Sequence, residues 1–128
     1  MTEFLHGLHG GIRYLVLLAG VIAVVAAALG WGRGNAVSWE RAAMGAFVGL
    51  LDAQVLIGIA LLLMWPFQPV LIGHITMMVL AAVVAHAGSV IARRRPPERQ
   101  ASGVRLAAIA IALVLIVGGI LAIQRPII

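Results

Sequence analysis

Four stretches of the chain are long and apolar enough to cross a lipid bilayer, and they constrain the fold more than any other feature. A membrane-spanning helix needs roughly 20 mostly apolar residues. Such stretches run from about 12 to 30, 42 to 65, 70 to 92 and 104 to 124. We therefore expect a single all-α domain over residues 1–128, built as a bundle of four transmembrane helices. Continuous apolar runs exclude a closed β-barrel, whose strands alternate apolar and polar residues.

The composition agrees with a chain that is solvated by lipid. Of its 128 residues, 63% are hydrophobic and 10% are charged, which is too little charge for the surface of a soluble domain. The formal net charge of +5 comes from Arg residues that flank the apolar stretches, so it indicates topology and no nucleic-acid partner. The chain has no Cys, which excludes disulfides, iron–sulfur clusters and thiolate haem ligands.

The distribution of Arg residues predicts the orientation. One side of the bundle carries the Arg residues between the first and second and between the third and fourth stretches: Arg33, Arg41, Arg93, Arg94, Arg95, Arg99 and Arg105. The other side has Arg13 and Arg125, together with an expected tight turn at Pro66 and Pro69. Because Arg-rich loops stay in the cytoplasm, we expect both termini outside, in the plasma (inner) membrane of a bacterium. No basic segment precedes the first stretch, so no cleaved signal peptide is expected.

Several polar side chains fall at membrane depth, where an ionisable group is costly unless it is paired or functional. They are His6, His9, Arg13, Asp52, Gln54, His74, Thr76 and His86. At a helical rise of about 1.5 Å per residue, the first two His and His74 share an outer layer. Asp52 and His86 share an inner layer by the same reasoning, and we expect them to form a hydrogen-bonded polar pair.

The outer layer suits a haem. A b-type haem iron takes two imidazoles from different helices of a bundle. His74 would supply one, and His9 or His6 the other; His9 is favoured because more helix precedes it. Arg13 lies four residues after His9, on the same helical face, where it could contact the haem propionates or extend to lipid headgroups. Both N-terminal His could instead be simple interfacial residues. No catalytic residue is predicted.

The order of short motifs resembles one repeat of the haem A synthase family of membrane haemoproteins. That family opens a helix on the outer side with Glu-x-x-His, which "EFLH" matches through Glu3 and His6. Its next helix carries Gln-x-x-Leu-Gly, which "QVLIG" matches through Gln54 and Gly58, with Ile57 at the Leu position.

The resemblance continues into the third stretch and covers roughly Glu3 to His86. The family has a Pro-containing outer turn and then a His, as in "GHITMMVLA" with His74. The resemblance implies His74 and His6, or its rival His9, as axial haem ligands. The family's His is usually followed by Arg, whereas His6 is followed by Gly. A full synthase has two repeats in eight helices, and this chain has one.

Three functions compete at this point. The leading hypothesis is a small b-type cytochrome-like protein that binds one haem b for electron transfer or haem handling, as a homodimer or within a larger membrane complex, with quinone as a candidate partner. The alternative is a cofactor-free accessory subunit of a respiratory or photosynthetic complex; the "GAFVG" motif with Gly45 and Gly49 is typical of close helix contact. A small multidrug-type transporter is disfavoured, because such proteins resemble one another in a Glu on the first helix, whereas Asp52 lies on the second. The sequence leaves enzymatic activity open.

Overall fold

The computed structural model describes residues 2–64, 71–96 and 98–122. The helices of this part are α1 (Thr2–Arg33), α2 (Glu40–Met64), α3 (Leu71–Arg93) and α4 (Arg99–Ala122). Each is long and apolar enough to cross a membrane, so the chain is a multi-pass membrane protein and the predicted all-α architecture is confirmed. The turn expected at Pro66 and Pro69 and the terminal Arg125 lie outside the described residues.

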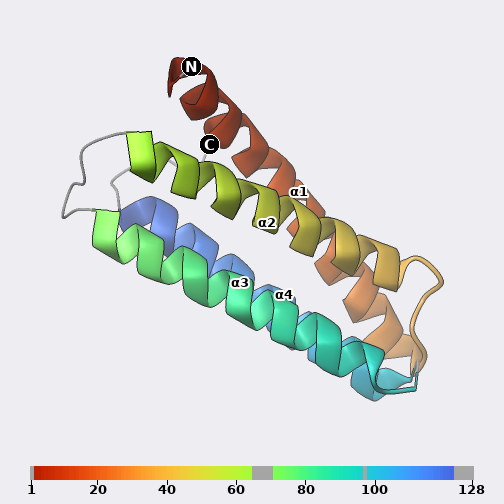
Figure 1. The fold of residues 1–128 in the computed structure, drawn as a ribbon. Coiled ribbons are helices and arrows are strands. Elements are labelled where there is room, and N and C mark those ends of the chain that lie inside the picture. Colours follow the sequence, from red (N-terminus) through yellow and green to blue (C-terminus); the bar gives the residue numbers. More distant parts are fainter. Residues whose placement is uncertain (1, 65–70, 97, 123–128) are drawn as a thin grey trace.

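The helices pack as a ring. α1 contacts α2 and α4, and α3 also contacts α2 and α4, so that α1 and α3 occupy one diagonal of the bundle. The α1–α2 and α3–α4 contacts are more extensive than the α2–α3 contact. Figure 1 shows α1 diverging from α3 and α4 toward the end at which α1 begins.

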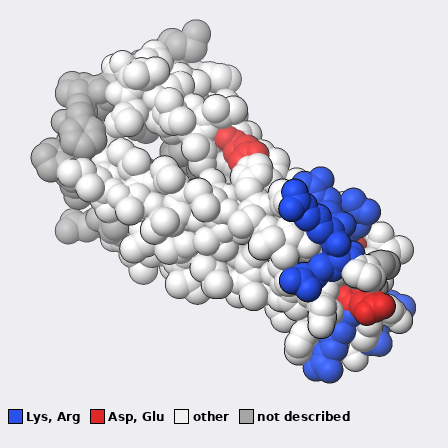
Figure 2. All heavy atoms as spheres, turned by 60° about the horizontal axis from the view of Figure 1, so that its bottom comes forward, with Lys and Arg blue, Asp and Glu red and all other residues white. Residues whose placement is uncertain are grey.

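Most Arg side chains gather at one end of the bundle (Figure 2). We call it the Arg-rich end; its exposed members are Arg33, Arg41, Arg93, Arg94, Arg95 and Arg99. Two loops meet there, joined by a bridge between Asn35 and Glu98. The end at which α1 begins and α4 finishes is called the opposite end.

Two helix boundaries differ from those predicted. α1 begins at Thr2 instead of at about residue 12, although His and Gly residues in its first turns are weak helix formers. Unpaired backbone N–H and C=O groups are costly at a membrane, and a helix pairs them internally, so this segment is helical despite its composition. α4 begins at Arg99 instead of at about residue 104, so "RQASG" forms its first turns. α1 ends before Gly34, whose φ of 84° is readily adopted only by glycine.

The tightly packed core lies toward the Arg-rich end. The buried residues of α3 are Ala81, Ala85, Gly88 and Ala92, and their small size lets α4 approach so closely that a Cβ at Gly88 would overlap Ala108. Phe47 of α2 fills the adjoining interior and is fully buried. Among the described side chains, none before Val16 in α1 and none before Ala81 in α3 is buried. In α1 and α3, burial is thus confined to the part toward the Arg-rich end, whereas Leu61 of α2 and Ile116 and Ile120 of α4 are buried toward the opposite end.

Candidate functional site

A carboxylate and an imidazole meet on the surface of the α2–α3 pair. Nε2 of His86 lies 2.7 Å from Oδ1 and 2.9 Å from Oδ2 of Asp52, so the ring N–H donates to the carboxylate. The predicted pairing of these two residues is confirmed. Their side chains remain 52% and 43% exposed, and Asp52 lies at the middle of α2. The pair therefore faces hydrocarbon, where half-exposed polar groups are costly.

His74 is held between α3 and α4. Its Nδ1 lies 2.9 Å from the carbonyl oxygen of Gly119. A carbonyl only accepts hydrogen bonds, so Nδ1 carries the proton and Nε2 carries the lone pair. The same arrangement fixes the tautomer of most metal-binding His residues, whose second nitrogen donates to a carbonyl or carboxylate.

His9 lies between α1 and α2. A Cβ at Gly58 would be 3.3 Å from Cε1 of His9, so the glycine leaves room for the imidazole. The side-chain nitrogen of Gln54 donates to the main-chain carbonyl of His9 at 2.7 Å. The Gln and Gly of the "QVLIG" motif thus both contact His9. His6, one helical turn earlier, is exposed.

Two buried polar atoms beside His9 lack hydrogen-bond partners in the described part of the chain. They are Nε of Arg13 and Oε1 of Gln54. The guanidinium of Arg13 also donates from Nη2 to the hydroxyl of Tyr14 at 2.9 Å and lies 4.7 Å from the centre of that ring. An unsatisfied buried polar group costs about 1–3 kcal/mol. Nε of Arg13 is a donor and suits an acceptor such as a carboxylate, whereas Oε1 of Gln54 is an acceptor and needs a separate donor.

His9 and His74 lie at similar depths on the diagonal helices. Gly58, which His9 contacts, is six residues before the end of α2 at Met64, or roughly 9 Å. His74 is three residues after the start of α3 at Leu71, or roughly 5 Å. The two residues therefore lie within about one helical turn of the same level, toward the opposite end of the bundle.

A metal ion held by side chains alone is not indicated. Among the described residues, no three His, Asp or Glu side chains come together as a metal site. Two imidazoles on separate helices suit an iron that brings its own equatorial ligands.

A buried ionic cluster at the Arg-rich end was missed by the sequence reasoning. Glu40 accepts a hydrogen bond from Nη1 of Arg105 through Oε2, and another from the hydroxyl of Ser102 at 2.8 Å through Oε1. The exposed fractions of Glu40, Arg105 and Ser102 are 1%, 3% and 0%. The prediction that Arg105 precedes the fourth helix is wrong, because it lies in the second turn of α4 and faces inward.

Gly30 of α1 completes this cluster. A Cβ there would overlap the hydroxyl of Ser102 and a carboxylate oxygen of Glu40. The cluster therefore joins α1, α2 and α4, which suits a structural role. The sequence held no distinct signal for this cluster, because Glu40 precedes the second apolar stretch like any charge at a membrane boundary.

Comparisons with protein-family models, with curated proteins and with solved structures find no match for this chain. The fold defines it as a four-span membrane protein. What distinguishes its opposite end is the presence of His residues on two diagonal helices, α1 and α3.

Proposed function

We propose that this protein binds one b-type haem at the opposite end of the bundle, with His74 and His9 as axial ligands, and acts in electron transfer or haem handling. The observation that carries the proposal is the hydrogen bond from Nδ1 of His74 to the Gly119 carbonyl. It leaves the Nε2 lone pair for a metal and fixes the ring against rotation.

The surroundings of His9 fit the polar edge of a haem. Nε of Arg13 is buried without a hydrogen-bond partner in the described chain, and a carboxylate such as a propionate would supply one. Gly58 provides space beside His9. Beside His74, Gly119 makes room for the imidazole and for the side chain of Met78, which a Cβ at that position would overlap.

Haem, when bound, supplies one-electron chemistry at its iron. The residues of the chain hold and orient it: the two imidazoles fix the iron, and Arg13 neutralises charge near the surface. By the Arg distribution, we place the Arg-rich end in the cytoplasm of a bacterial cell, so that the haem lies near the outer face of the plasma membrane. Quinone is a candidate electron partner in that location.

An absorption spectrum of detergent-purified protein, expressed with ample haem, tests the proposal. We expect a low-spin, six-coordinate spectrum, because imidazoles fill both axial positions. His74→Ala and His9→Ala should abolish it, whereas His6→Ala should preserve it. His86→Ala is the matched control, since this residue is bonded to Asp52 and should leave ligation unchanged. Absence of Soret absorbance in the parent protein would refute haem binding.

A second candidate, a cofactor-free accessory subunit or homodimer, is favoured by the outer face of α2. Gly45, Gly49 and Asp52 are spaced by four and three residues, so they share one face. A Cβ at either glycine would meet no described atom within 4 Å. The "GAFVG" motif therefore makes no close contact within the described chain, and a second helix could cover both the glycines and the polar pair.

Cysteine cross-linking tests this second candidate directly, because the chain has no Cys of its own. Gly49→Cys should form a disulfide-linked dimer in membranes if α2 faces a second copy. Val114→Cys, on the exposed surface of α4, is the control and should remain monomeric. Equal cross-linking of both variants would argue against a specific α2 interface.

A further inference from the structure

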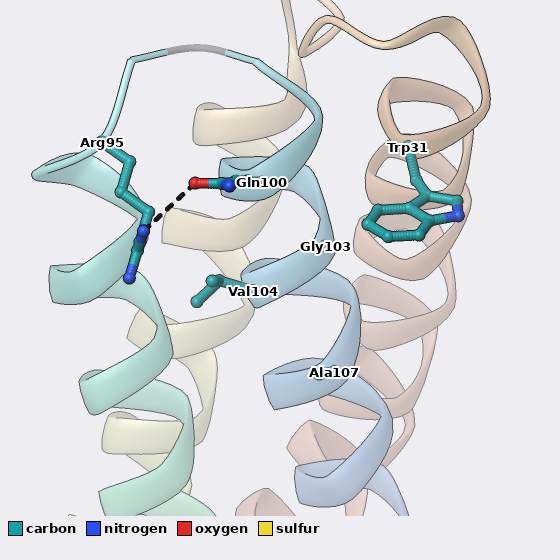
Figure 3. A pocket seen from close by; sticks show the side chains of 6 residues that line it. All are labelled: Trp31, Arg95, Gln100, Gly103, Val104 and Ala107. Atoms are coloured by element: carbon teal, nitrogen blue, oxygen red, sulfur yellow. Dashed lines mark hydrogen bonds between the residues drawn. The ribbon is translucent and has the colours of Figure 1, made fainter.

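A groove on the outside of α4 at the Arg-rich end has a polar head and an apolar continuation. Its head is a hollow of about 420 Å³ lined by Trp31, Arg95, Gln100, Gly103, Val104 and Ala107. Figure 3 shows Trp31 and Arg95 on opposite sides of α4, with the small residues of α4 between them. α1 and the α3–α4 loop thus supply the walls, and α4 supplies the floor.

The floor is shaped by small residues. A Cβ at Gly103 would lie 2.6 Å from Cζ3 of Trp31, so only glycine lets the indole lie against α4. The guanidinium of Arg99, also on α4, stacks on the indole at 4.0 Å from the ring centre. Trp31 is thus a fixed wall, of the kind that Trp provides at membrane interfaces.

The floor continues along α4 as an apolar strip. Farther along the helix, Ala110, Ile111, Val114 and Leu115 line a second hollow of about 270 Å³. Residues 103, 107, 110, 111 and 114 follow helical spacing, so they form one face. From 103 to 114 the face is about 16 Å long at the helical rise. That length matches one leaflet of a hydrocarbon core roughly 30 Å thick.

The charges at the head are those that bind a phosphate group. Nη1 of Arg95 donates to Oε1 of Gln100 at 3.3 Å, and this bond uses one of the five N–H donors of the guanidinium. The Gln100 amide keeps its NH₂ as a further donor. Six exposed Arg residues surround this end, and Glu98 is the exposed acid of the same loop. An anionic headgroup is therefore favoured over a zwitterionic one.

We propose that this groove binds an anionic glycerophospholipid of the leaflet at the Arg-rich end. Arg95 and Gln100 hold the phosphate, and one acyl chain lies along the strip from Gly103 to Val114. Guanidinium binds phosphate oxygens through two parallel hydrogen bonds, and the apolar strip adds the affinity that a soluble phosphate cannot obtain. The proposal is independent of haem binding.

Quenching of Trp31 by brominated lipids tests the proposal. Trp39→Phe and Trp65→Phe leave Trp31 as the single tryptophan of the full-length chain. In mixed vesicles, brominated phosphatidylglycerol should quench Trp31 with an apparent affinity about tenfold above that of brominated phosphatidylcholine. One charge-assisted hydrogen bond accounts for a difference of this size. Arg95→Gln should bring the two lipids to within twofold of each other. Equal affinities for both lipids in the parent protein would overturn the proposal.

Two further variants separate a built site from general attraction to basic loops. Arg94→Gln removes the same charge from the same loop but does not line the groove, so the preference for phosphatidylglycerol should persist. If Arg94→Gln abolishes it as fully as Arg95→Gln, binding is diffuse and the site does not exist. Ala107→Leu fills the floor and should weaken quenching by both lipids. If millimolar glycerol phosphate reduced the quenching of Trp31 as strongly as a competing phospholipid does, the role of the acyl strip would be refuted.

Discussion

Replacing Glu40 by Ala tests the buried cluster that joins α1, α2 and α4. The substitution leaves the guanidinium of Arg105 without its carboxylate in a position where only 3% of the residue is exposed. Breaking a buried ion pair by removing one partner costs about 3–5 kcal/mol. The hydroxyl of Ser102 also loses its acceptor, but this loss belongs to the same cluster and does not add independently. We expect a total loss of about 3–5 kcal/mol in the free energy of unfolding.

The assay is equilibrium unfolding of the purified protein in mixed micelles, followed by tryptophan fluorescence. Glu98→Ala is the control, because Glu98 is an exposed acid at the same end and its loss should cost less than about 0.5 kcal/mol. Glu40→Gln keeps an acceptor for Ser102 and should fall between the parent and Glu40→Ala. The double variant Glu40→Leu, Arg105→Leu should lose less stability than Glu40→Leu alone or Arg105→Leu alone. A coupling energy below about 0.5 kcal/mol in this cycle would refute the reasoning.

Three further outcomes are expected. In a double-mutant cycle, Asp52→Leu and His86→Leu should be less than additive, with Asp52→Asn milder than Asp52→Leu; strict additivity would mean that the contact contributes nothing. Gly88→Ala should destabilise the protein by about 1–3 kcal/mol, because the new methyl group overlaps α4, whereas Gly45→Ala in open space should be neutral or stabilising. Equal changes in melting temperature for Gly88→Ala and Gly45→Ala would contradict the close packing of α3 against α4 at Gly88. A reporter that is active only in the cytoplasm, fused after Ile128, should be silent, and activity there would reverse the orientation.

The four spans could be predicted from the sequence because a helix solvated by lipid needs roughly 20 mostly apolar residues, so the whole length of each helix carries the pattern. Depth was also predictable, since the rise per residue is constant, and depth alone paired Asp52 with His86. The start of α1 was placed too late, because glycine and histidine lower local helix propensity while the membrane favours continued backbone pairing.

Contacts between helices were not predictable in the same way. Glu40 and Arg105 are 65 residues apart, and each alone has the properties of a charge at a membrane boundary. Their burial depends on how α2 and α4 are rotated about their axes, which is set by packing over whole helices. The same holds for His9 and His74. Their depth along the bundle could be predicted from the sequence, whereas the placement of α1 and α3 on one diagonal is known only from the contacts between helices.

The uneven packing along the bundle has a consequence for its dynamics. Buried alanines and glycines, together with the Glu40 cluster, make the Arg-rich half the most stable cooperative unit, so its amides should be the slowest to exchange hydrogen. In the half that contains His9 and His74, α1 before Val16 and α3 before Ala81 bury no described side chain, so these segments should open locally at lower free-energy cost. A ligand bound there would stabilise that half through mass action, by about 2.7 kcal/mol at a hundredfold excess over Kd. The rate of amide exchange in the first turns of α1 and α3 would then show whether a ligand is bound at this end of the bundle, even for a ligand that absorbs no light.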